Sequence, residues 1–156
     1  MKILHVSKYY TPYNGGIENV AFNLVEGSRL EGHQVDVLCF NDSNKNSQEV
    51  FTRHKIIRAK RLFLLFSLPI SWTYIKYLIQ LVNDYDIIHV HTPNPLALFG
   101  LILIKIKSKL IIHWHSDIIE QKISYFLLQS IHKKALKKAD KIILTTKNYL
   151  KSSTQL

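Results

Sequence analysis

Two pairs of histidines have the residue type and spacing that binding or catalysis requires. The stretch "DIIHVH" carries His89 and His91, and "KLIIHWH" carries His113 and His115. Alternate residues of a strand point to the same side, so the members of each pair share one face. Each pair ends an apolar run and precedes polar residues, "TPNP" and "SD". We therefore expect four imidazoles at one edge of a sheet.

Three interpretations of these pairs follow from the chemistry of imidazole. In the first, His89 and His113 lie deeper and are hydrogen-bonded core residues. In the second, all four rings, with Asp117, hold zinc or another transition metal, as in a metal-dependent hydrolase. In the third, His91 and His115 at the strand ends hydrogen-bond a polar ligand such as a sugar hydroxyl.

A second feature is the pair Gly15 and Gly16, directly before a stretch with apolar residues at helical spacing. Backbone N–H groups and the dipole at the start of a helix attract phosphate, and glycine allows a ligand to approach the main chain. The spacing lacks the G-x-G-x-x-G pattern of a dinucleotide site. A flexible turn is the alternative interpretation of the same two residues.

Strands and helices alternate along the chain and are expected to position these residues. Apolar runs predict strands at 2–7, 34–40, 86–91, 109–115 and 140–146, with a more exposed strand within 50–60 after a polar loop at 41–49. Helical spacing predicts helices at 17–31, 70–83, 94–107 and 123–139. This order is typical of a doubly wound α/β (Rossmann-like) fold with a mostly parallel sheet, which binds ligands at the carboxyl ends of its strands.

Length and composition predict a single domain, residues 1–156, with a substantial core, since 47% of the residues are hydrophobic. The single cysteine, Cys39, lies in an apolar run, which excludes an internal disulfide and favours a reducing compartment. The apolar start of the chain is too short for a signal peptide, and Pro69 and Lys76 interrupt the one long apolar stretch. We therefore expect a cytoplasmic protein.

The formal net charge of +10 predicts an anionic partner. No nucleic-acid recognition motif is present, so we expect no nucleic acid among the partners. A basic helix, together with Trp72 in an aromatic-rich segment, favours docking on an anionic membrane surface. The basic run in and directly after that helix consists of Lys133, Lys134, Lys137, Lys138 and Lys141.

Four stretches in order resemble the amino-terminal domain of the retaining nucleotide-sugar glycosyltransferases of family 4, which have the two-domain GT-B architecture. They are "MKILHVSKYYTPYNGGIENVAFNLVEGSRLEGHQVDVL", "YDIIHVHTPNPLA", "KLIIHWHSDII" and "KKADKIILTTKNYLKSS". The resemblance implies an acceptor-binding domain that helps to move a hexose from a nucleoside diphosphate sugar to a bacterial-type surface glycan or lipid-linked acceptor. It implies no metal or other cofactor in this domain.

The resemblance also implies residue roles. Gly15 and Gly16 would contact the donor diphosphate and the transferred sugar, and His115 would contact the hydroxyls of that sugar near the reaction centre. Loop residues at the carboxyl edge would contact the acceptor, for which we consider Tyr9, Tyr10, Tyr13, His91, Asn94 and Asp117. The domain would associate peripherally with the inner face of the cell membrane.

Members of this family have a second domain that binds the nucleotide and carries a Glu-x7-Glu motif. Glu18 and Glu26 have this spacing but lie on the first predicted helix, so their spacing is coincidental. We therefore expect that a carboxyl-terminal donor domain lies outside this chain and that the chain alone catalyses no turnover. Besides the metal-dependent hydrolase, the alternative interpretation is a non-catalytic module that binds a glycan or a membrane.

Overall fold

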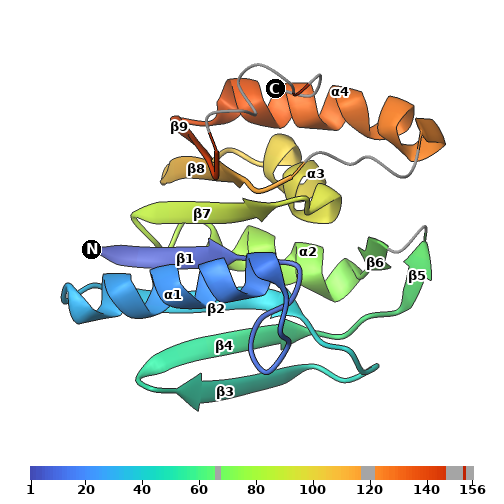
Figure 1. The fold of residues 1–156 in the computed structure, drawn as a ribbon. Coiled ribbons are helices and arrows are strands. Elements are labelled where there is room, and N and C mark those ends of the chain that lie inside the picture. Colours follow the sequence, from blue (N-terminus) through green and yellow to red (C-terminus); the bar gives the residue numbers. More distant parts are fainter. Residues whose placement is uncertain (66–67, 117–121, 147–152, 154–156) are drawn as a thin grey trace.

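The computed structural model describes residues 1–65, 68–116, 122–146 and 153 and shows strands alternating with helices (Figure 1). The strands are β1 (Lys2–Val6), β2 (Gln34–Phe40), β3 (Ser47–Phe51), β4 (His54–Ala59), β5 (Phe63–Leu65), β6 (Leu68–Ile70), β7 (Ile87–Thr92), β8 (Lys109–Trp114) and β9 (Lys141–Leu144). The helices are α1 (Gly16–Leu30), α2 (Trp72–Leu81), α3 (Pro95–Leu103) and α4 (Lys122–Lys138).

The main sheet has the strand order β3-β4-β2-β1-β7-β8-β9. All neighbouring pairs are parallel except β3 with β4, which is an antiparallel edge pair. The chain winds outward from β1 in one direction through β2 and β4, and in the other through β7, β8 and β9. The strand order therefore reverses between β1 and β7, which is the point where sheets of this class bind ligands.

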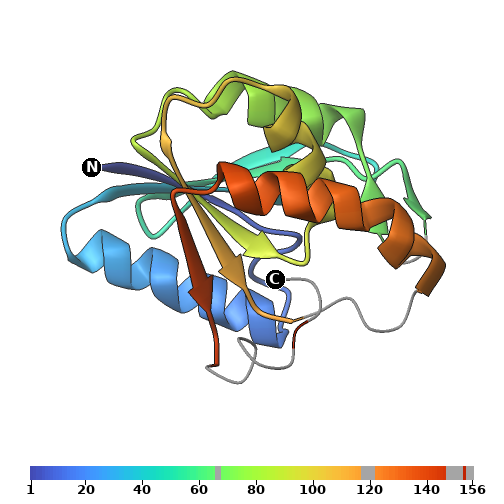
Figure 2. The same ribbon diagram turned by 90° about the horizontal axis from the view of Figure 1, so that it is seen from above.

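Helices cover both faces of this sheet (Figure 2). Leu4, Ile88 and Ile112 point to the face that α2, α3 and α4 cover, and they share one core cluster with residues of those helices. Ile3 and Val37 point to the other face and pack with Ala21 and Val25 of α1. Because strand side chains alternate, the odd-numbered histidines of β1, β7 and β8 lie on the face that carries α1.

Polar side chains fix the starts of α2 and α3. Ser71 accepts a hydrogen bond from the backbone N–H of Tyr74, and Asn94 accepts one from that of Ala97. Pro95 at the first position of α3 needs no such partner, because proline has no N–H. The first turn of α3 is thereby held at the carboxyl end of β7.

The predicted doubly wound α/β class is confirmed, whereas some local predictions are wrong. The expected exposed strand within 50–60 is a hairpin of β3 and β4, and β4 is largely buried. Thr52 and Arg53 form its two-residue turn with φ of 43° and 76°, a geometry that normally favours asparagine or glycine. The predicted polar loop at 41–49 also includes the start of β3, and α3 ends at Leu103 rather than near residue 107.

The short hairpin of β5 and β6 was not predicted. Its strands come from the apolar stretch that precedes α2 and pair apart from the main sheet (Figure 1). Among the helices described here, none is both long and apolar enough to cross a membrane.

Candidate functional site

Five buried histidines lie together at the middle of the sheet, and we call them the imidazole cluster. They are His5 of β1, His89 and His91 of β7, His113 of β8, and His115 directly after β8. Each is at most 9% exposed. The register pairs His5 with His89 and His91 with His113, so the rings lie side by side across three strands. The predicted meeting of the two histidine pairs is confirmed.

His5 was not singled out from the sequence. The signal was present, because "KILHVS" places a histidine on the same strand face as Ile3. A single histidine in an apolar strand resembles an ordinary core residue, and only strand pairing reveals that it adjoins the other four.

Ring-to-ring hydrogen bonds join the cluster in two groups. His91 lies between two partners: its Nε2 is 3.0 Å from Nδ1 of His5, and its Nδ1 is 3.0 Å from Nε2 of His115. Separately, Nε2 of His89 lies 3.3 Å from Nδ1 of His113. His89 and His113 are thus hydrogen-bonded to each other, as the first interpretation expects, but they are not the deeper pair, since His91 is 0% exposed against 8% for His89 and 6% for His113.

Burial keeps these imidazoles uncharged at neutral pH. Burial, and then the neighbouring histidines, hold the pKa of His5 and His91 well below the usual range. The same causes lower the pKa of His89 and of His115 to about 4. Burial alone lowers the pKa of His113. A cluster of neutral rings can donate and accept hydrogen bonds, or bind a metal, without first losing protons.

The cluster has the composition of a metal site but not its spacing. One nitrogen from each of His89, His91 and His113 lies within 4.8 Å of the other two. Zinc binds histidine nitrogens at about 2.0–2.1 Å in a tetrahedral arrangement. The three rings would have to turn inward and exchange their present hydrogen bonds for metal ligands.

The Gly15–Gly16 pair begins α1 as predicted, with Gly15 as the N-cap and Gly16 as the first helical residue. A Cβ atom at Gly15 would lie 2.2 Å from Oε2 of Glu18, so the side chain of Glu18 folds back against this glycine. Its carboxylate therefore lies at the positive end of the helix dipole. Both views show this end of α1 at the same edge of the sheet as the carboxyl end of β8 (Figures 1 and 2).

Three predicted acceptor contacts need correction. We expected Tyr10, His91 and Asn94 to present side chains to a ligand, but each is at most 2% exposed. Asn94 Nδ2 donates to the hydroxyl of Tyr74, and His91 is enclosed by other imidazoles. The polar atoms of these side chains thus have partners within the fold, including His54 for the hydroxyl of Tyr10.

The remaining predicted donor and acceptor contacts are Tyr9, Tyr13, Asp117 and His115. Tyr9 and Tyr13 are half-buried, and their ring centroids are 5.0 Å apart in the loop before α1. Asp117 lies outside the described residues. His115 is 9% exposed.

The predicted docking surface is accessible at Trp72, Lys133, Lys134 and Lys137, all of them exposed. Lys138 was wrongly included. Its Nζ donates to the backbone carbonyls of Leu101, at 2.7 Å, and of Ile104. The ammonium therefore caps the carboxyl end of α3, where unpaired carbonyls and the helix dipole favour a cation.

A largely apolar cavity of ≈ 220 Å³ adjoins this surface. Its walls come from the β5–β6 hairpin, the first turns of α3, and α4, which contributes Leu128 and Ile131. Among the described residues, Lys8 and Asn94 are the polar ones that line it. The neighbouring segment Leu62, Phe63, Leu64 and Leu65 is 41–54% exposed.

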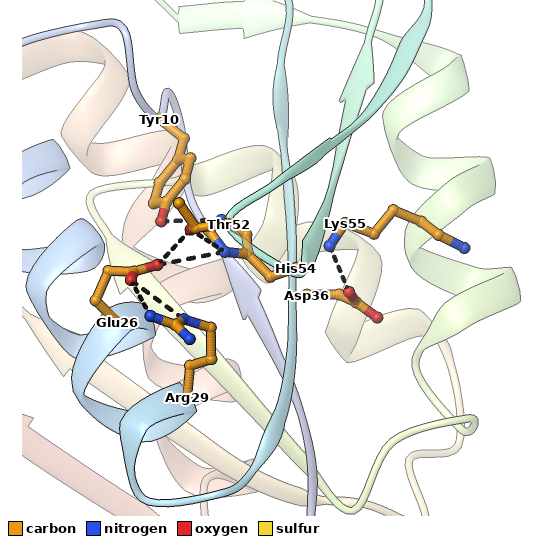
Figure 3. A network of polar contacts seen from close by, with 7 residues as sticks. All are labelled: Tyr10, Glu26, Arg29, Asp36, Thr52, His54 and Lys55. Atoms are coloured by element: carbon orange, nitrogen blue, oxygen red, sulfur yellow. Dashed lines mark hydrogen bonds and ion pairs between the residues drawn. The ribbon is translucent and has the colours of Figure 1, made fainter.

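A sixth buried histidine, His54 of β4, belongs to a different arrangement, the Glu26–His54 network (Figure 3). The Nδ1 atom of His54 lies 3.4 Å from Oε1 of Glu26, and its Nε2 lies 3.4 Å from the hydroxyl of Tyr10. Thr52 donates to the same carboxylate oxygen, while Arg29 bonds the other. The network ties the loop before α1 to α1 itself and to the β3–β4 hairpin.

Solved structures define the class of this fold. A sucrose-phosphate synthase from Thermosynechococcus elongatus superposes with a TM-score of 0.69 at 17% identity, over 96% of this chain and 44% of that one. The catalytic domain of starch synthase IV from Arabidopsis thaliana gives a TM-score of 0.51 at 12% identity, over 73% of this chain and 34% of that one. The chain has the fold of one domain of a GT-B glycosyltransferase.

Sequence comparison then gives the family. The model of glycosyltransferase family 4 matches residues 14–153, and the chain belongs to that family. Over its full length, the chain is 33% identical to the O-antigen chain mannosyltransferase C of Escherichia coli and 29% identical to the D-rhamnosyltransferase WbpZ of Pseudomonas aeruginosa. It spans 42% and 41% of the lengths of these two relatives.

Proposed function

We propose that this chain is the acceptor-binding part of a retaining glycosyltransferase that moves a hexose from a nucleoside diphosphate sugar to a surface glycan or a lipid-linked acceptor. The observation that carries the proposal is that the carboxyl end of β8, which His115 directly follows, lies at the same edge of the sheet as the start of α1. This is the edge at which sheets of this class bind ligands. The names of both relatives describe sugar transfer, and the first refers to O-antigen.

The residues at this edge suit binding and orientation better than covalent catalysis. His115 is neutral at pH 7, since burial lowers its pKa to about 4, and it would orient a sugar hydroxyl by a hydrogen bond. The backbone N–H groups at Gly15 and Gly16 would face the diphosphate, which requires the carboxylate of Glu18 to move aside. A donor domain outside this chain would bind the nucleotide.

Sugar transfer by a joined protein tests the proposal. The chain is fused to the unmatched part of the E. coli mannosyltransferase relative and supplied with pooled nucleotide sugars and lipid-linked acceptor. We expect transfer by the fused protein, none by the chain alone, and a loss of about 10²-fold in His115→Ala, as for removal of one polar group at a reaction centre. The matched control is His33→Ala, just before β2, at the opposite edge.

Equal activity of the His115→Ala and parent fusions would remove His115 from the site. An absence of both transfer and nucleotide-sugar hydrolysis in the fused protein would contradict the acceptor-domain proposal.

We further propose that the protein works at the cytoplasmic face of the cell membrane. The exposed segment 62–65, Trp72 and the lysines of α4 would contact lipid, since apolar and cationic side chains together favour an anionic bilayer surface. Cosedimentation with vesicles rich in anionic lipid should fall after Lys133, Lys134 and Lys137 are changed to glutamine. The matched control changes three exposed lysines elsewhere, Lys45, Lys55 and Lys107; equal loss in both triple variants would leave only a general charge effect.

A metal-dependent hydrolase is the second candidate function, and the grouping of His89, His91 and His113 favours it. Zinc titration followed by elemental analysis tests it. One tightly bound zinc per chain, lost in His89→Ala, would support the hydrolase over the transferase.

A further inference from the structure

Three histidines of the imidazole cluster form a continuous hydrogen-bonded chain across the sheet. It runs from His5 on β1, through His91 on β7, to His115 after β8, with both ring-to-ring distances at 3.0 Å. His5 and His91 are at most 1% exposed, so the inner part of the chain is shielded from water. Only His115 stands at the end of a strand, at the edge where ligands bind in this fold.

The hydrogen-bonded row of His5, His91 and His115 has a direction. A neutral imidazole has one N–H and one lone pair, so a ring that donates to one neighbour must accept from the other. His91 therefore either accepts from His5 and donates to His115, or does the reverse. In the first arrangement, each of the three rings carries its proton on Nδ1; in the second, each carries it on Nε2.

The inner end of the chain selects between the two arrangements. Nε2 of His5 is buried and has no hydrogen-bond partner among the described residues. If the protons were on Nε2, an N–H group would be stranded there, and orphaned buried N–H groups are rarer than unsatisfied acceptors. Placing the protons on Nδ1 leaves only a lone pair at this position.

We propose that His5 and His91 are positioning residues that fix the tautomer of His115, so that His115 presents its Nδ1–H as a hydrogen-bond donor. The matching ligand group is an oxygen with a free lone pair, as on a sugar. Identification of this oxygen as that of the transferred sugar rests on the proposed function. The tautomer itself does not, because it follows from the fold of this chain.

The remaining two rings supply an internal comparison. His89 and His113 bond to each other and are joined to the chain by stacking alone. Changing His89 therefore disturbs the imidazole cluster without removing a hydrogen bond between His5, His91 and His115. It is a matched control for a change at His91, which lies on the same strand and the same face.

Two-bond ¹H–¹⁵N correlation NMR on this chain at pH 7 tests the inference, since it distinguishes Nδ1–H from Nε2–H. We expect Nδ1–H for His5, His91 and His115. This differs from an unconstrained histidine, for which Nε2–H is favoured in water. Nε2–H at His115 would overturn the inference, even if the fused protein transfers sugar.

Substitutions separate positioning from folding. In His91→Leu, His115 loses its donor and should shift toward Nε2–H, whereas His89→Leu should leave the Nδ1–H signal unchanged. In His91→Asn, the new amide can present either its N–H or its oxygen at the former Nδ1 position, and with the N–H toward His115 the parent tautomer should return. If His91→Leu does not fold, the spectrum of the parent chain still decides, because Nε2–H at His115 there would refute positioning through this hydrogen bond.

Activity adds a second measurement in the fused protein. Loss of a group that fixes an imidazole tautomer costs about 10–100-fold in comparable sites. We expect His91→Leu to lower transfer by about tenfold at the low end of that range, with His91→Asn close to the parent. Equal losses in His91→Leu and His89→Leu would show only a general packing defect and would overturn the proposed positioning role.

Discussion

Buried histidines occupy two regions of this sheet, and their partners differ. In the imidazole cluster, the described hydrogen bonds of the rings join imidazole to imidazole. In the Glu26–His54 network, the ring lies between a carboxylate and a phenol, and the guanidinium of Arg29 bonds the same carboxylate (Figure 3). One region contains only neutral donors and acceptors, whereas the other contains an ion pair.

The two regions therefore have different roles. The network holds the loop that carries Tyr10, Gly15 and Gly16 against α1 and β4, and its hydroxyls and charges are satisfied among themselves. The cluster ends at the carboxyl edge with His115, and at its inner end Nε2 of His5 finds no partner in the described part of the chain. His54, whose partner is the carboxylate of Glu26, therefore stabilises the fold. The uncharged imidazoles of the cluster instead hold His115 as a hydrogen-bond donor in a fixed direction.

Acidification should lower the stability of the protein, through the imidazole cluster, more than any single substitution does. The folded-state pKa values lie below the unfolded value of 6.5, reaching about 4 for His89 and for His115. The unfolded chain therefore binds more protons than the folded one, and stability falls as the pH drops from about 6.5 toward about 4. Each histidine that is protonated only on unfolding costs about 1.4 kcal/mol per pH unit in this window.

Urea unfolding at pH 7, 6 and 5 measures this loss. A double variant, His89→Leu with His113→Leu, should show a shallower fall, while His33→Gln should match the parent. An unfolding midpoint that stays constant from pH 7 to pH 5 would contradict the description of the cluster as buried neutral rings.

Matched substitutions in the two regions should differ in cost. His91→Leu leaves two buried nitrogens without a partner, one on His5 and one on His115, at about 1–3 kcal/mol each. His54→Leu leaves one buried partner, the hydroxyl of Tyr10, because Glu26 keeps Arg29 and Thr52. The free energy of unfolding at pH 7 should therefore fall about twice as far in His91→Leu. Equal losses would mean that the two regions are energetically alike.

The sequence alone predicts the features of the imidazole cluster that depend on the alternation of side chains along a strand. Alternation placed His89 with His91 and His113 with His115 on one face, and the near-continuous apolar strands indicated a parallel sheet. The meeting of the two pairs followed from neighbouring strands that end at the same edge. These features are local, or depend only on the general rules of α/β folds.

Features that depend on three-dimensional packing were not predictable. Whether Tyr10 points outward or inward depends on how the loop before α1 folds onto β4, and no local pattern encodes that. Lys138 looked like one lysine in a basic run, but only the approach of α4 to the end of α3 shows that it caps a helix. His5 was missed for the same reason, since its neighbours come from β7.

Glu26→Gln should have a smaller effect than His54→Leu, and in a different pH range. Arg29 lowers the pKa of Glu26, so this carboxylate contributes stability that is present above about pH 4.5 and is lost as the pH falls through its lower folded value. Thermal unfolding of parent and variant should therefore differ at pH 6 and converge toward pH 3. A difference that grows on acidification would show that the ion pair is not what holds the network together.

Tyr10→Phe should have the smallest effect. The hydroxyl lies 3.4 Å from Nε2 of His54, a long hydrogen bond, and the ring keeps its contact with Phe22. We expect a loss of about 0.5 kcal/mol in urea unfolding. Tyr74→Phe, the matched control, should cost more, because its buried hydroxyl accepts from Asn94 at 2.9 Å and donates to the carbonyl of Ser7 at 3.2 Å. In the fused protein, Tyr10→Phe should leave sugar transfer unchanged; a loss as large as that of His115→Ala would place the Tyr10 hydroxyl on the ligand and end the distinction between a supporting and a binding region.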